Sequence, residues 1–354
     1  MFLGVFYIIW IGVIWWGFYK IPDFEVQTIS PKTGFSIIIP FKNETENLSG
    51  LIDSLQKLHY PDRLFEIITV DDHSNDNSSK IVENQPNIKL INNIGKGKKQ
   101  ALQTGIMQAR FKWIITIDAD CQVSSKYLQS LNAFILQRQP EMLLGPVRYF
   151  DTKSFLGQFQ QFEFLCLQAL TIAGVGYHKA FLANGANLIF RKQSFEAVKG
   201  YEGNIDIASG DDTFLLQKFT RNFPDKIRFI KSGSAIVKTK AAKSFIELIH
   251  QKIRWAGKSR TKGSAIAKFT GIITVLFHLV LIYAFLTLSA NYGFVIIKIM
   301  ADAFCLYQIN RFYRVKLDWW FYVLGFVIYP FYLILIFILA LKGTYHWKGQ
   351  TYRQ

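Results

Sequence analysis

Two aspartates, Asp118 and Asp120, follow the apolar run Trp113–Ile117 and are separated by a single residue. Side chains two positions apart on an extended strand end point the same way, so these carboxylates would repel each other unless a cation joined them. Carboxylate oxygens are hard ligands, and Mg²⁺ typically uses one or two of them together with substrate phosphates. We therefore predict that Asp118 and Asp120 hold Mg²⁺ or Mn²⁺ against a diphosphate.

A second acidic pair, Asp211-Asp212, follows Ser209-Gly210 and precedes the apolar run Phe214–Leu216. In one interpretation the pair stabilises the first turn of a helix through the backbone dipole. In the other, one of the two carboxylates is a general base that accepts the proton of an acceptor hydroxyl. Both interpretations can hold together. No Ser–His or Cys–His pairing accompanies these acids in the sequence, so a protein nucleophile is not expected.

A third group, Gln251, Arg254 and Trp255, lies in a helix that we predict from Ser244 to Lys258. Their spacing of three and four residues puts them on one face of that helix. An arginine gives two-point contacts to phosphate oxygens, and an indole face suits the stacking of a sugar ring. The alternative is an amphipathic interfacial helix in which the tryptophan is only a membrane anchor.

The elements that must position these residues alternate along the chain. We predict strands at 35–39, 65–70, 88–91 and 113–117, with helices at 47–58, 76–84 and 99–109 between them. Such alternation implies a mainly parallel sheet, in which ligands bind at the carboxyl ends of the strands. Three of the strands end in polar residues: Pro40–Glu44, Asp71-Asp72 and Asp118–Asp120. The sequence therefore predicts an α/β domain with its site at this edge.

Three runs without charge, 1–19, 269–297 and 319–341, approach or exceed the length needed to cross a bilayer. Basic residues lie next to these runs. By the positive-inside tendency, they predict that the block between the first run and the second lies in the cytoplasm. Lys298 and Asp302 make a further span at 293–310 costly. We expect an integral, multi-pass protein of the inner or plasma membrane, with an N-terminal anchor (1–19), a cytoplasmic catalytic domain (20–243), an interfacial basic helix (244–268), a transmembrane region of two or three spans (269–341) and a basic tail (342–354).

Composition supports a membrane partner over nucleic acid. The chain is 50% hydrophobic and has a net charge of +16, from 41 basic and 25 acidic residues. Basic residues next to spans hold a protein against anionic headgroups, and no nucleic-acid-binding module is present in the sequence. The three cysteines, Cys121, Cys166 and Cys305, form no disulfide or metal-ligand pattern.

Taken in order, the motifs over about residues 34–258 resemble those of the family 2 glycosyltransferases, which are inverting enzymes with the GT-A nucleotide-sugar fold. The resemblance extends to the membrane-bound group with a Gln-x-x-Arg-Trp motif, which includes cellulose synthase, N-acetylglucosaminyltransferases and ceramide glucosyltransferase. The ordered set comprises Ile39–Glu44, Val70–Ser74, Gly97–Leu102, Asp118–Asp120, Gly185–Asn187, Asp211-Asp212 and Gln251–Trp255.

The resemblance implies a role for each matching position. Asp118 would lie by the ribose and Asp120 on the metal, and Asp212 would be the catalytic base. The base motif here has Asp211 before Asp212, where the family usually has Glu-Asp, which leaves Asp211 as the alternative base. The other implied contacts are nucleotide-sugar binding by Pro40, Lys42, Asn43, Glu44, Asp72, Lys98 and Asp118, and diphosphate or acceptor binding by Gly185, Asn187, Gln251, Arg254 and Trp255.

The expected activity is metal-dependent, inverting transfer of a sugar from a nucleotide-sugar donor to a membrane lipid or to a lipid-linked or saccharide acceptor. A processive polysaccharide synthase is the main alternative, and three or four spans offer little wall for a polymer channel. An inactive scaffold of the same fold and a nucleotidyltransferase are the remaining candidates. Carboxylates without a balancing charge at a sheet edge have no structural purpose, which argues against an inactive scaffold. Release of pyrophosphate would identify a nucleotidyltransferase.

Overall fold

The computed structural model describes residues 2–27, 29–151, 153–205, 209–262, 264–287, 292–347 and 350–353. Contacts divide the chain into two compact units. The sheet unit comprises residues 21–148 and 177–240, and the helical unit comprises residues 1–20, 149–176 and 241–354.

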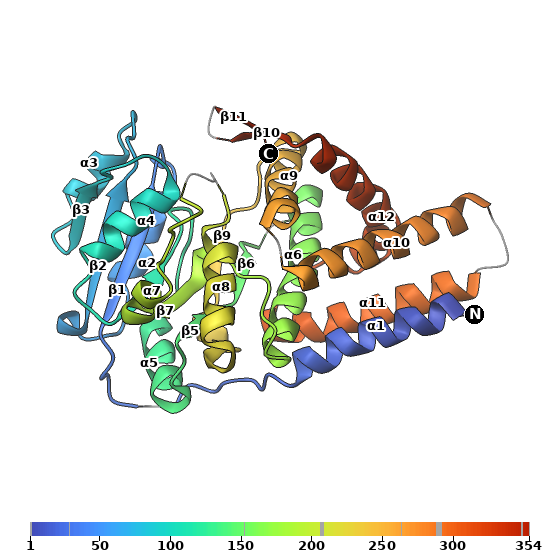
Figure 1. Ribbon diagram of the computed structural model, residues 1–354, viewed down its shortest axis with the longest axis horizontal. Helices are drawn as coiled ribbons and strands as arrows, with labels where there is room; N and C mark the ends of the chain where they lie inside the picture. The colour runs from blue at the N-terminus through green and yellow to red at the C-terminus, as the bar shows by residue number, and fades with distance from the viewer. Residues whose placement is uncertain are drawn as a thin grey trace. The chain divides into compact units, whose positions relative to one another are not determined.

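A seven-stranded sheet forms the centre of the sheet unit, in the order β3-β2-β1-β4-β7-β5-β8 (Figure 1). Strands β3, β2, β1 and β4 run parallel, as do β5 and β8, whereas β7 is antiparallel to both of its neighbours. The predicted α/β class with a mainly parallel sheet is confirmed. The strands are β1 (Phe35–Phe41), β2 (Phe65–Asp71), β3 (Ile88–Asn92), β4 (Trp113–Thr116), β5 (Met142–Leu144), β7 (Leu188–Arg191) and β8 (Ile227–Phe229).

Strand β1 lies at the centre of the parallel part and is buried along its whole length. A strand that is covered on both faces needs a continuous apolar run, which is what Phe35–Phe41 supplies. Its register pairs Phe41 with Asp71 on β2, and Asp71 in turn with Asn92 on β3. The polar residues that follow these strands therefore begin at the same edge of the sheet.

Helices of the sheet unit start close to the predicted positions. Helix α2 buries Leu48, Leu51, Ile52 and Leu55, the one-sided pattern of an amphipathic helix. Helix α4 packs against β1 and β2. The helices are α2 (Leu48–Gln56), α3 (Ser78–Glu83), α4 (Lys98–Met107), α5 (Tyr127–Arg138), α7 (Lys192–Ala197) and α8 (Asp211–Asn222), with short 3₁₀ turns η1 (Asp62–Leu64), η2 (Gly185–Asn187), η3 (Pro224–Lys226) and η4 (Gly233–Ala235).

A small second sheet pairs β6 (Val147–Tyr149) with β9 (Val237–Thr239). An isolated bridge joins Gln122 to Lys238 on β9, and both of its backbone hydrogen bonds are formed. This bridge brings the residue after Lys238, Thr239, to the segment that carries Asp118 and Asp120.

The helical unit consists of six helices and a C-terminal hairpin in the part of the chain that the structure describes. Its long helix α12 continues through Pro330, and the uncharged run 269–297 is divided between α10 and α11. Lys348, Gly349 and Gln354 of the predicted tail lie outside the described residues. The elements are α1 (Phe2–Tyr19), α6 (Phe155–Gly176), α9 (Phe245–Lys262), α10 (Ala265–Thr287), α11 (Tyr292–Tyr313), α12 (Trp319–Lys342), β10 (Thr344–Trp347) and β11 (Gln350–Arg353).

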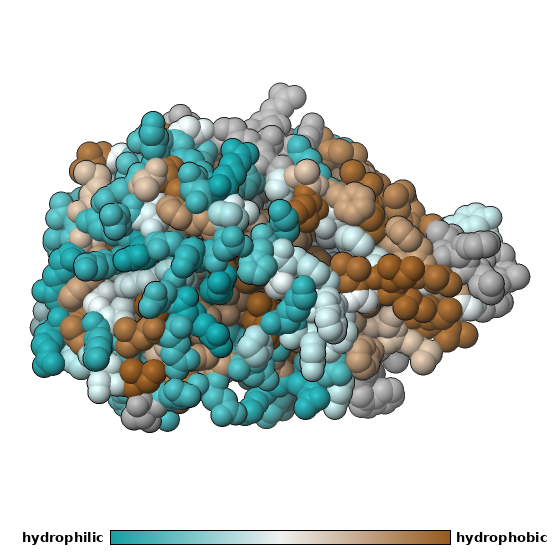
Figure 2. All heavy atoms as spheres, turned by 60° about the horizontal axis from the view of Figure 1, so that its bottom comes forward, coloured by the Kyte–Doolittle hydropathy of each residue, from teal (hydrophilic) through white to brown (hydrophobic). Residues whose placement is uncertain are grey.

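Three described helices are long and apolar enough to cross a membrane, over Ala265–Thr287, Gly293–Tyr313 and Gly325–Lys342, and the shorter stretch Gly4–Tyr19 is also apolar. Many of their large hydrophobic side chains are exposed, including Ile9, Leu276 and Met300. Figure 2 shows hydrophobic residues gathered on the side where Figure 1 draws α1, α10 and α11. Such a continuous apolar surface suits a bilayer.

Lys298 and Asp302 are the two charges that make a span over 293–310 costly. They lie one turn apart on α11 and neutralise each other. The Lys298 Nζ lies 2.6 Å from Asp302 Oδ2, and the hydroxyl of Tyr7 on α1 donates to Asp302. Ionisable side chains inside an apolar helix bundle are tolerated when they pair in this way.

Candidate active site

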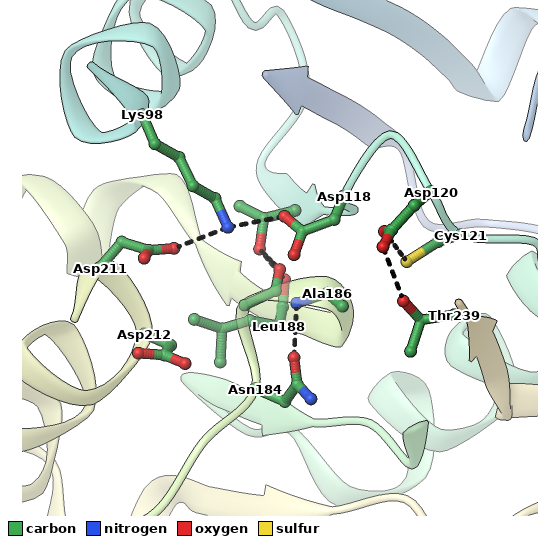
Figure 3. Close-up of polar contacts among 12 residues, drawn as sticks. Lys98, Asp118, Asp120, Cys121, Asn184, Ala186, Leu188, Asp211, Asp212 and Thr239 are labelled. Atoms are coloured by element: carbon green, nitrogen blue, oxygen red, sulfur yellow. Dashed lines mark hydrogen bonds and ion pairs between the residues drawn. The ribbon is translucent and has the colours of Figure 1, made fainter. Parts of the chain in front are cut away.

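Lys98, the first residue of α4, lies between two acidic residues from other elements. Its Nζ is 2.6 Å from Asp118 Oδ1 and 3.4 Å from Asp211 Oδ2 (Figure 3). Burial alone would lower the pKa of Lys98, but the carboxylates of Asp118 and Asp211 raise it well above its ordinary value. The structure therefore joins the end of β4 and the start of α8 through one charged ammonium group.

Asp120 has a different environment from Asp118. Its Oδ2 accepts a hydrogen bond from Thr239 Oγ1 at 3.1 Å, and its Oδ1 accepts one from Cys121 Sγ at 3.5 Å (Figure 3). Burial, followed by the negative charges of Asp118 and Glu44, raises the pKa of Asp120 to about 6. When burial and negative neighbours raise the pKa of a carboxyl group in this way, a nearby cation stabilises its ionised form.

The donor set at this edge fits a divalent cation that is shared with a substrate. Within the described ranges, no group of three or more His, Cys, Asp or Glu side chains gathers into a protein-only metal cage. Mg²⁺ and similar ions are commonly held by one or two carboxylates and completed by substrate phosphates. Asp120 and Asp118 fit that arrangement. Of the two, Asp120 has less positive charge beside it in the protein.

Asp211 and Asp212 form the first turn of α8, so the helix-start interpretation of the pair describes the backbone correctly. Gly210, at φ +84°, turns the chain into the helix, in a left-handed conformation that favours glycine. Asp212 Oδ1 accepts from the backbone N–H of Thr213 at 2.6 Å and from its hydroxyl at 3.1 Å. Asp211 instead points to Lys98, so the two neighbouring carboxylates have different partners.

Lys99, on the same helix as Lys98, contacts both the segment that precedes α8 and α8 itself. Its Nζ donates to the carbonyl of Asn204 at 2.6 Å and lies 4.8 Å from the centre of the Phe214 ring. Two consecutive lysines of α4 thus hold the acidic start of α8, one through charge and the other through a hydrogen bond and a cation–π contact.

Gly185, in the turn η2, allows the acidic cluster to approach the backbone closely. A Cβ at this position would lie 2.8 Å from Asp211 Oδ2 and 3.5 Å from Lys98 Nζ. The hydroxyl of Thr116, on β4, donates to the Gly185 carbonyl at 2.8 Å and holds the turn in place. A side chain at this position would therefore require the Asp211 carboxylate to shift.

Asn187 is the centre of a buried hydrogen-bond network. Its Oδ1 accepts from the Tyr127 hydroxyl at 2.7 Å, and its Nδ2 donates to the carbonyls of Pro146 at 2.9 Å and Ala235 at 3.0 Å. The structure thus places the side chain among protein groups, where it ties η2 to α5 and to the segments around β6 and η4.

The residues predicted to contact the nucleoside follow β1 and β2. Pro40 is buried and is the next-to-last residue of β1. Lys42, Asn43 and Glu44 lie directly after the end of this strand. Asn43 adopts φ 54° and its Oδ1 accepts from the N–H of Asn75 at 2.9 Å, while Glu44 Oε2 accepts from Asn47 Nδ2 at 2.5 Å.

Asp72 links the end of β2 to the start of α4. Its Oδ1 accepts from Asn93 Nδ2 at 2.7 Å and from the backbone N–H of Gly97 at 2.8 Å. These bonds position the turn that precedes Lys98, so Asp72 also supports the lysine that joins the two acidic groups.

Gln251, Arg254 and Trp255 lie on α9, which belongs to the helical unit. The Trp255 ring centre is 4.2 Å from Lys252 Nζ and 6.2 Å from the centre of the Phe164 ring. The other predicted site residues belong to the sheet unit, where Lys98, Asp118, Asp211 and Gly185 come together.

Two residues of the site were missed at the level of sequence. Lys99 lies inside the Gly97–Leu102 motif, and its position next to Lys98 was the available signal. Thr239 carries no comparable signal, because its contact with Asp120 depends on the bridge between Gln122 and Lys238.

Part of this chain is similar to known proteins. Residues 36–198 match the family model described as Glycosyl transferase family 2. The probable glycosyltransferase YdaM of Bacillus subtilis (strain 168) is 27% identical over 232 residues, which cover 62% of this chain and 54% of that protein. A poly-beta-1,6-N-acetyl-D-glucosamine synthase of Staphylococcus epidermidis is 25% identical over 174 residues, 46% of this chain and 41% of that one. The chain thus matches about half the length of these relatives.

A solved structure shares the fold. The mannosyltransferase PcManGT from Pyrobaculum calidifontis, in complex with GDP-Man and Mn²⁺, has a TM-score of 0.56 and 18% identity, with 93% of each chain covered. The predicted GT-A architecture of the sheet-bearing part is therefore confirmed.

Proposed function

We propose, from the glycosyl transferase family 2 domain at residues 36–198, that this chain transfers a sugar with inversion from a nucleotide-sugar donor to an acceptor at a membrane. The observation that carries this proposal is the contact of Lys98 with both Asp118 and Asp211. It supports a site in which donor-side and acceptor-side acids lie at one edge of the sheet.

The donor is a nucleotide-sugar held at the ends of β1, β2 and β4. Pro40, Lys42, Asn43, Glu44 and Asp72 take the nucleoside, and Asp118 takes the ribose. Support comes from the hydrogen-bonded turns that follow β1 and β2, and from the mannosyltransferase with the same fold, which was solved with GDP-Man.

Mg²⁺ or Mn²⁺ is the proposed cofactor, with Asp120 and Asp118 as its protein ligands. A divalent cation here supplies charge stabilisation to the departing diphosphate. Thr239 orients Asp120 through its hydroxyl, and Lys98 keeps positive charge beside Asp118. The presence of Mn²⁺ in the mannosyltransferase complex supports the assignment.

Asp212 is the proposed general base, which accepts the proton of the acceptor hydroxyl. Asp211 contacts the Lys98 ammonium at 3.4 Å, so we assign its carboxylate to holding that lysine. Asp212 is oriented by the N–H and hydroxyl of Thr213. Asp211 and Gly185 then keep Lys98 in place, and Asn187 keeps η2 in place. These roles replace the diphosphate or acceptor contact that the resemblance implied for Gly185 and Asn187, because the Asn187 side chain is bonded to three protein groups and Gly185 lies against Asp211 and Lys98.

The acceptor is a membrane lipid or a lipid-linked or other saccharide, reached from the cytoplasmic side by an integral, multi-pass protein. Three described helices long and apolar enough to cross a membrane support this proposal, as do the exposed apolar side chains on them. Gln251, Arg254 and Trp255 are the residues proposed to contact the diphosphate and the acceptor. A processive polysaccharide synthase is the second candidate, supported by the relative named poly-beta-1,6-N-acetyl-D-glucosamine synthase.

The proposal is tested by incubating membranes that contain the protein with a panel of UDP- and GDP-sugars and analysing the lipid extract. We expect one donor to yield a sugar-modified lipid or oligosaccharide together with free nucleoside diphosphate. Long polymer would favour the synthase, and pyrophosphate release without sugar transfer would contradict both glycosyltransferase candidates.

A further inference from the structure

Helix α6 of the helical unit buries an unusual number of polar side chains for an otherwise apolar helix. Gln160 is fully buried and brackets the backbone of Ala242, because its Nε2 donates to the Ala242 carbonyl at 3.0 Å and its Oε1 accepts from the Ala242 N–H at 2.8 Å. Ala242 lies just before the start of α9. The chain that enters α9 is therefore fixed to α6 by a two-point contact.

One turn further along, Glu163 of α6 forms an ion pair with Lys252 of α9. The Lys252 Nζ lies 2.6 Å from Glu163 Oε2, and the two side chains are only 4% and 9% exposed. Removing both charges from water is costly, and breaking such a pair by changing one partner leaves a buried charge uncompensated. A pair of this kind therefore fixes the rotation of α9 against α6.

The same ammonium group of Lys252 faces Trp255, three residues along α9. It lies 4.2 Å from the centre of the indole ring, within the distance of a cation–π interaction. Phe164, next to Glu163, contacts the same ring at 6.2 Å between centres. Trp255 thus has neighbours from both helices, and Glu163 determines where its cationic neighbour lies.

We infer that Glu163 is a positioning residue that, through Lys252, fixes the orientation of the Trp255 indole for the acceptor. This inference rests on the proposed function, which assigns Trp255 to the acceptor. Glu163 itself touches neither donor nor acceptor in this account. Its effect is exerted on the ring that does.

Two variants test the inference in the full-length protein. Glu163→Gln leaves the Lys252 ammonium buried without its partner, whereas Glu163→Gln combined with Lys252→Met removes both charges and keeps the apolar stem. A matched control, Lys298→Met combined with Asp302→Asn, removes the buried ion pair of α11 in the same unit. For each protein we would measure kcat for sugar transfer, the thermal unfolding midpoint, and the fluorine NMR resonance of Trp255 after fluorotryptophan labelling, assigned by its loss in Trp255→Phe.

We expect Glu163→Gln to lower kcat by as much as about 100-fold, the scale expected of a misplaced contact group, and to shift the Trp255 resonance. The double variant should regain thermal stability while kcat stays low and the resonance stays shifted, because the ring has lost its cation. The control should leave the Trp255 resonance unchanged.

Recovery of wild-type kcat together with stability in the double variant would overturn the inference, since the pair would then be merely structural. An unshifted Trp255 resonance in both Glu163 variants would overturn it as well. Failure of the wild-type protein to transfer any sugar would overturn the proposed function instead, and the fluorine measurement would still decide whether Glu163 controls Trp255.

Discussion

At the scale of single residues, Lys98 neutralises only part of the negative charge at the edge of the sheet. Its ammonium contacts Asp118 and Asp211, whereas Asp120 accepts hydrogen bonds from the hydroxyl of Thr239 and the thiol of Cys121. These are neutral donors, so the two carboxylates of the Asp-x-Asp motif differ in how their charge is balanced. This asymmetry makes Asp120 the carboxylate whose response to a metal can be followed as a function of pH.

The pKa of Asp120, which is raised from 3.8 to about 6, predicts how a metal should act at different pH. Because the folded state holds the proton more tightly, the stability that this group contributes is present below pH 3.8 and is lost as the pH rises through about 6. A cation bound to the ionised form should offset that loss. Mn²⁺ should therefore raise the thermal unfolding midpoint more at about pH 7.5 than at about pH 5.

The control for this prediction is Asp120→Asn, which removes the titrating group. The dependence of the Mn²⁺ effect on pH should largely disappear in this variant. An equal shift at both pH values in the wild-type protein would contradict the assignment of Asp120 to the metal.

The two aspartates at the start of α8 should respond differently to the same substitution. Asp212→Asn should lower kcat by roughly 10²- to 10⁴-fold, the range expected of a general base, and leave nucleoside diphosphate affinity nearly unchanged. Asp211→Asn should weaken the hold on Lys98 and have a smaller effect on kcat. Steady-state kinetics and titration with the nucleoside diphosphate distinguish the two, and the reverse order would assign the base to Asp211.

Residue types were predictable at this edge, but their pairing was not. Asp72, Asp118 and Asp120 follow apolar strands, so their gathering at one edge of the sheet could be expected from the sequence. Asp211 and Asp212 instead start helix α8, and only the resemblance to a known family placed them at the same site. The contact of Lys98 with two of these acidic groups depends on where α4 begins after Gly97, which adopts φ 96°. Spacing along the chain does not encode that meeting point.

At the scale of elements, the turn η2 sets how closely β4 and the start of α8 can approach. Gly185→Ala would place a Cβ 2.8 Å from Asp211 Oδ2, which must push that carboxylate away from Lys98. We expect kcat to fall by about tenfold or more, as a small displacement of a contact group suffices for this. Gly233→Ala is the matched control, because a Cβ there meets nothing within 4 Å, and equal kinetics in the two variants would show that η2 does not position the site.

Helix α9 offers a test that separates a catalytic role from a membrane-anchoring one. In Arg254→Lys the positive charge remains, so attraction to anionic headgroups, about 1 kcal/mol per charge, should persist. A lysine cannot reproduce the planar two-point contact of an arginine with phosphate, so sugar transfer should fall sharply while membrane association is unchanged. Unaltered transfer by Arg254→Lys would indicate that α9 serves as an anchor only.

The elements differ in how far the sequence defines them. Strands β1 to β4 and helices α2 to α4 were predicted within two residues at each end, because apolar runs and polar breaks mark them locally. The antiparallel position of β7 between β4 and β5 was not predicted, since it results from long-range pairing. Helix α6 lies within the stretch expected to be one soluble block, yet it packs in the helical unit through contacts such as Gln160 with Ala242, 82 residues away.

At the scale of the whole molecule, one chain contains both a match to the Glycosyl transferase family 2 model and helices long and apolar enough to cross a membrane. The uncharged runs 269–297 and 319–341 overlap the candidate spans Ala265–Thr287 and Gly325–Lys342. The candidate span Gly293–Tyr313 carries Lys298 and Asp302, which made it costly in the sequence, and these two charges form an ion pair. The family model covers residues 36–198, so the C-terminal helices extend beyond the matched domain. A hydrophobic acceptor near a bilayer would explain why the two kinds of segment occur in one chain.

The most direct test of the central claim is the stereochemistry and stoichiometry of one transfer reaction. With the active α-linked donor identified, the product is analysed by NMR for the configuration of its new glycosidic bond, and the released nucleotide is quantified in parallel. We predict a β-linked product and one nucleoside diphosphate per sugar transferred, with both signals lost together in Asp212→Asn. An α-linked product, or undiminished transfer by Asp212→Asn, would contradict it.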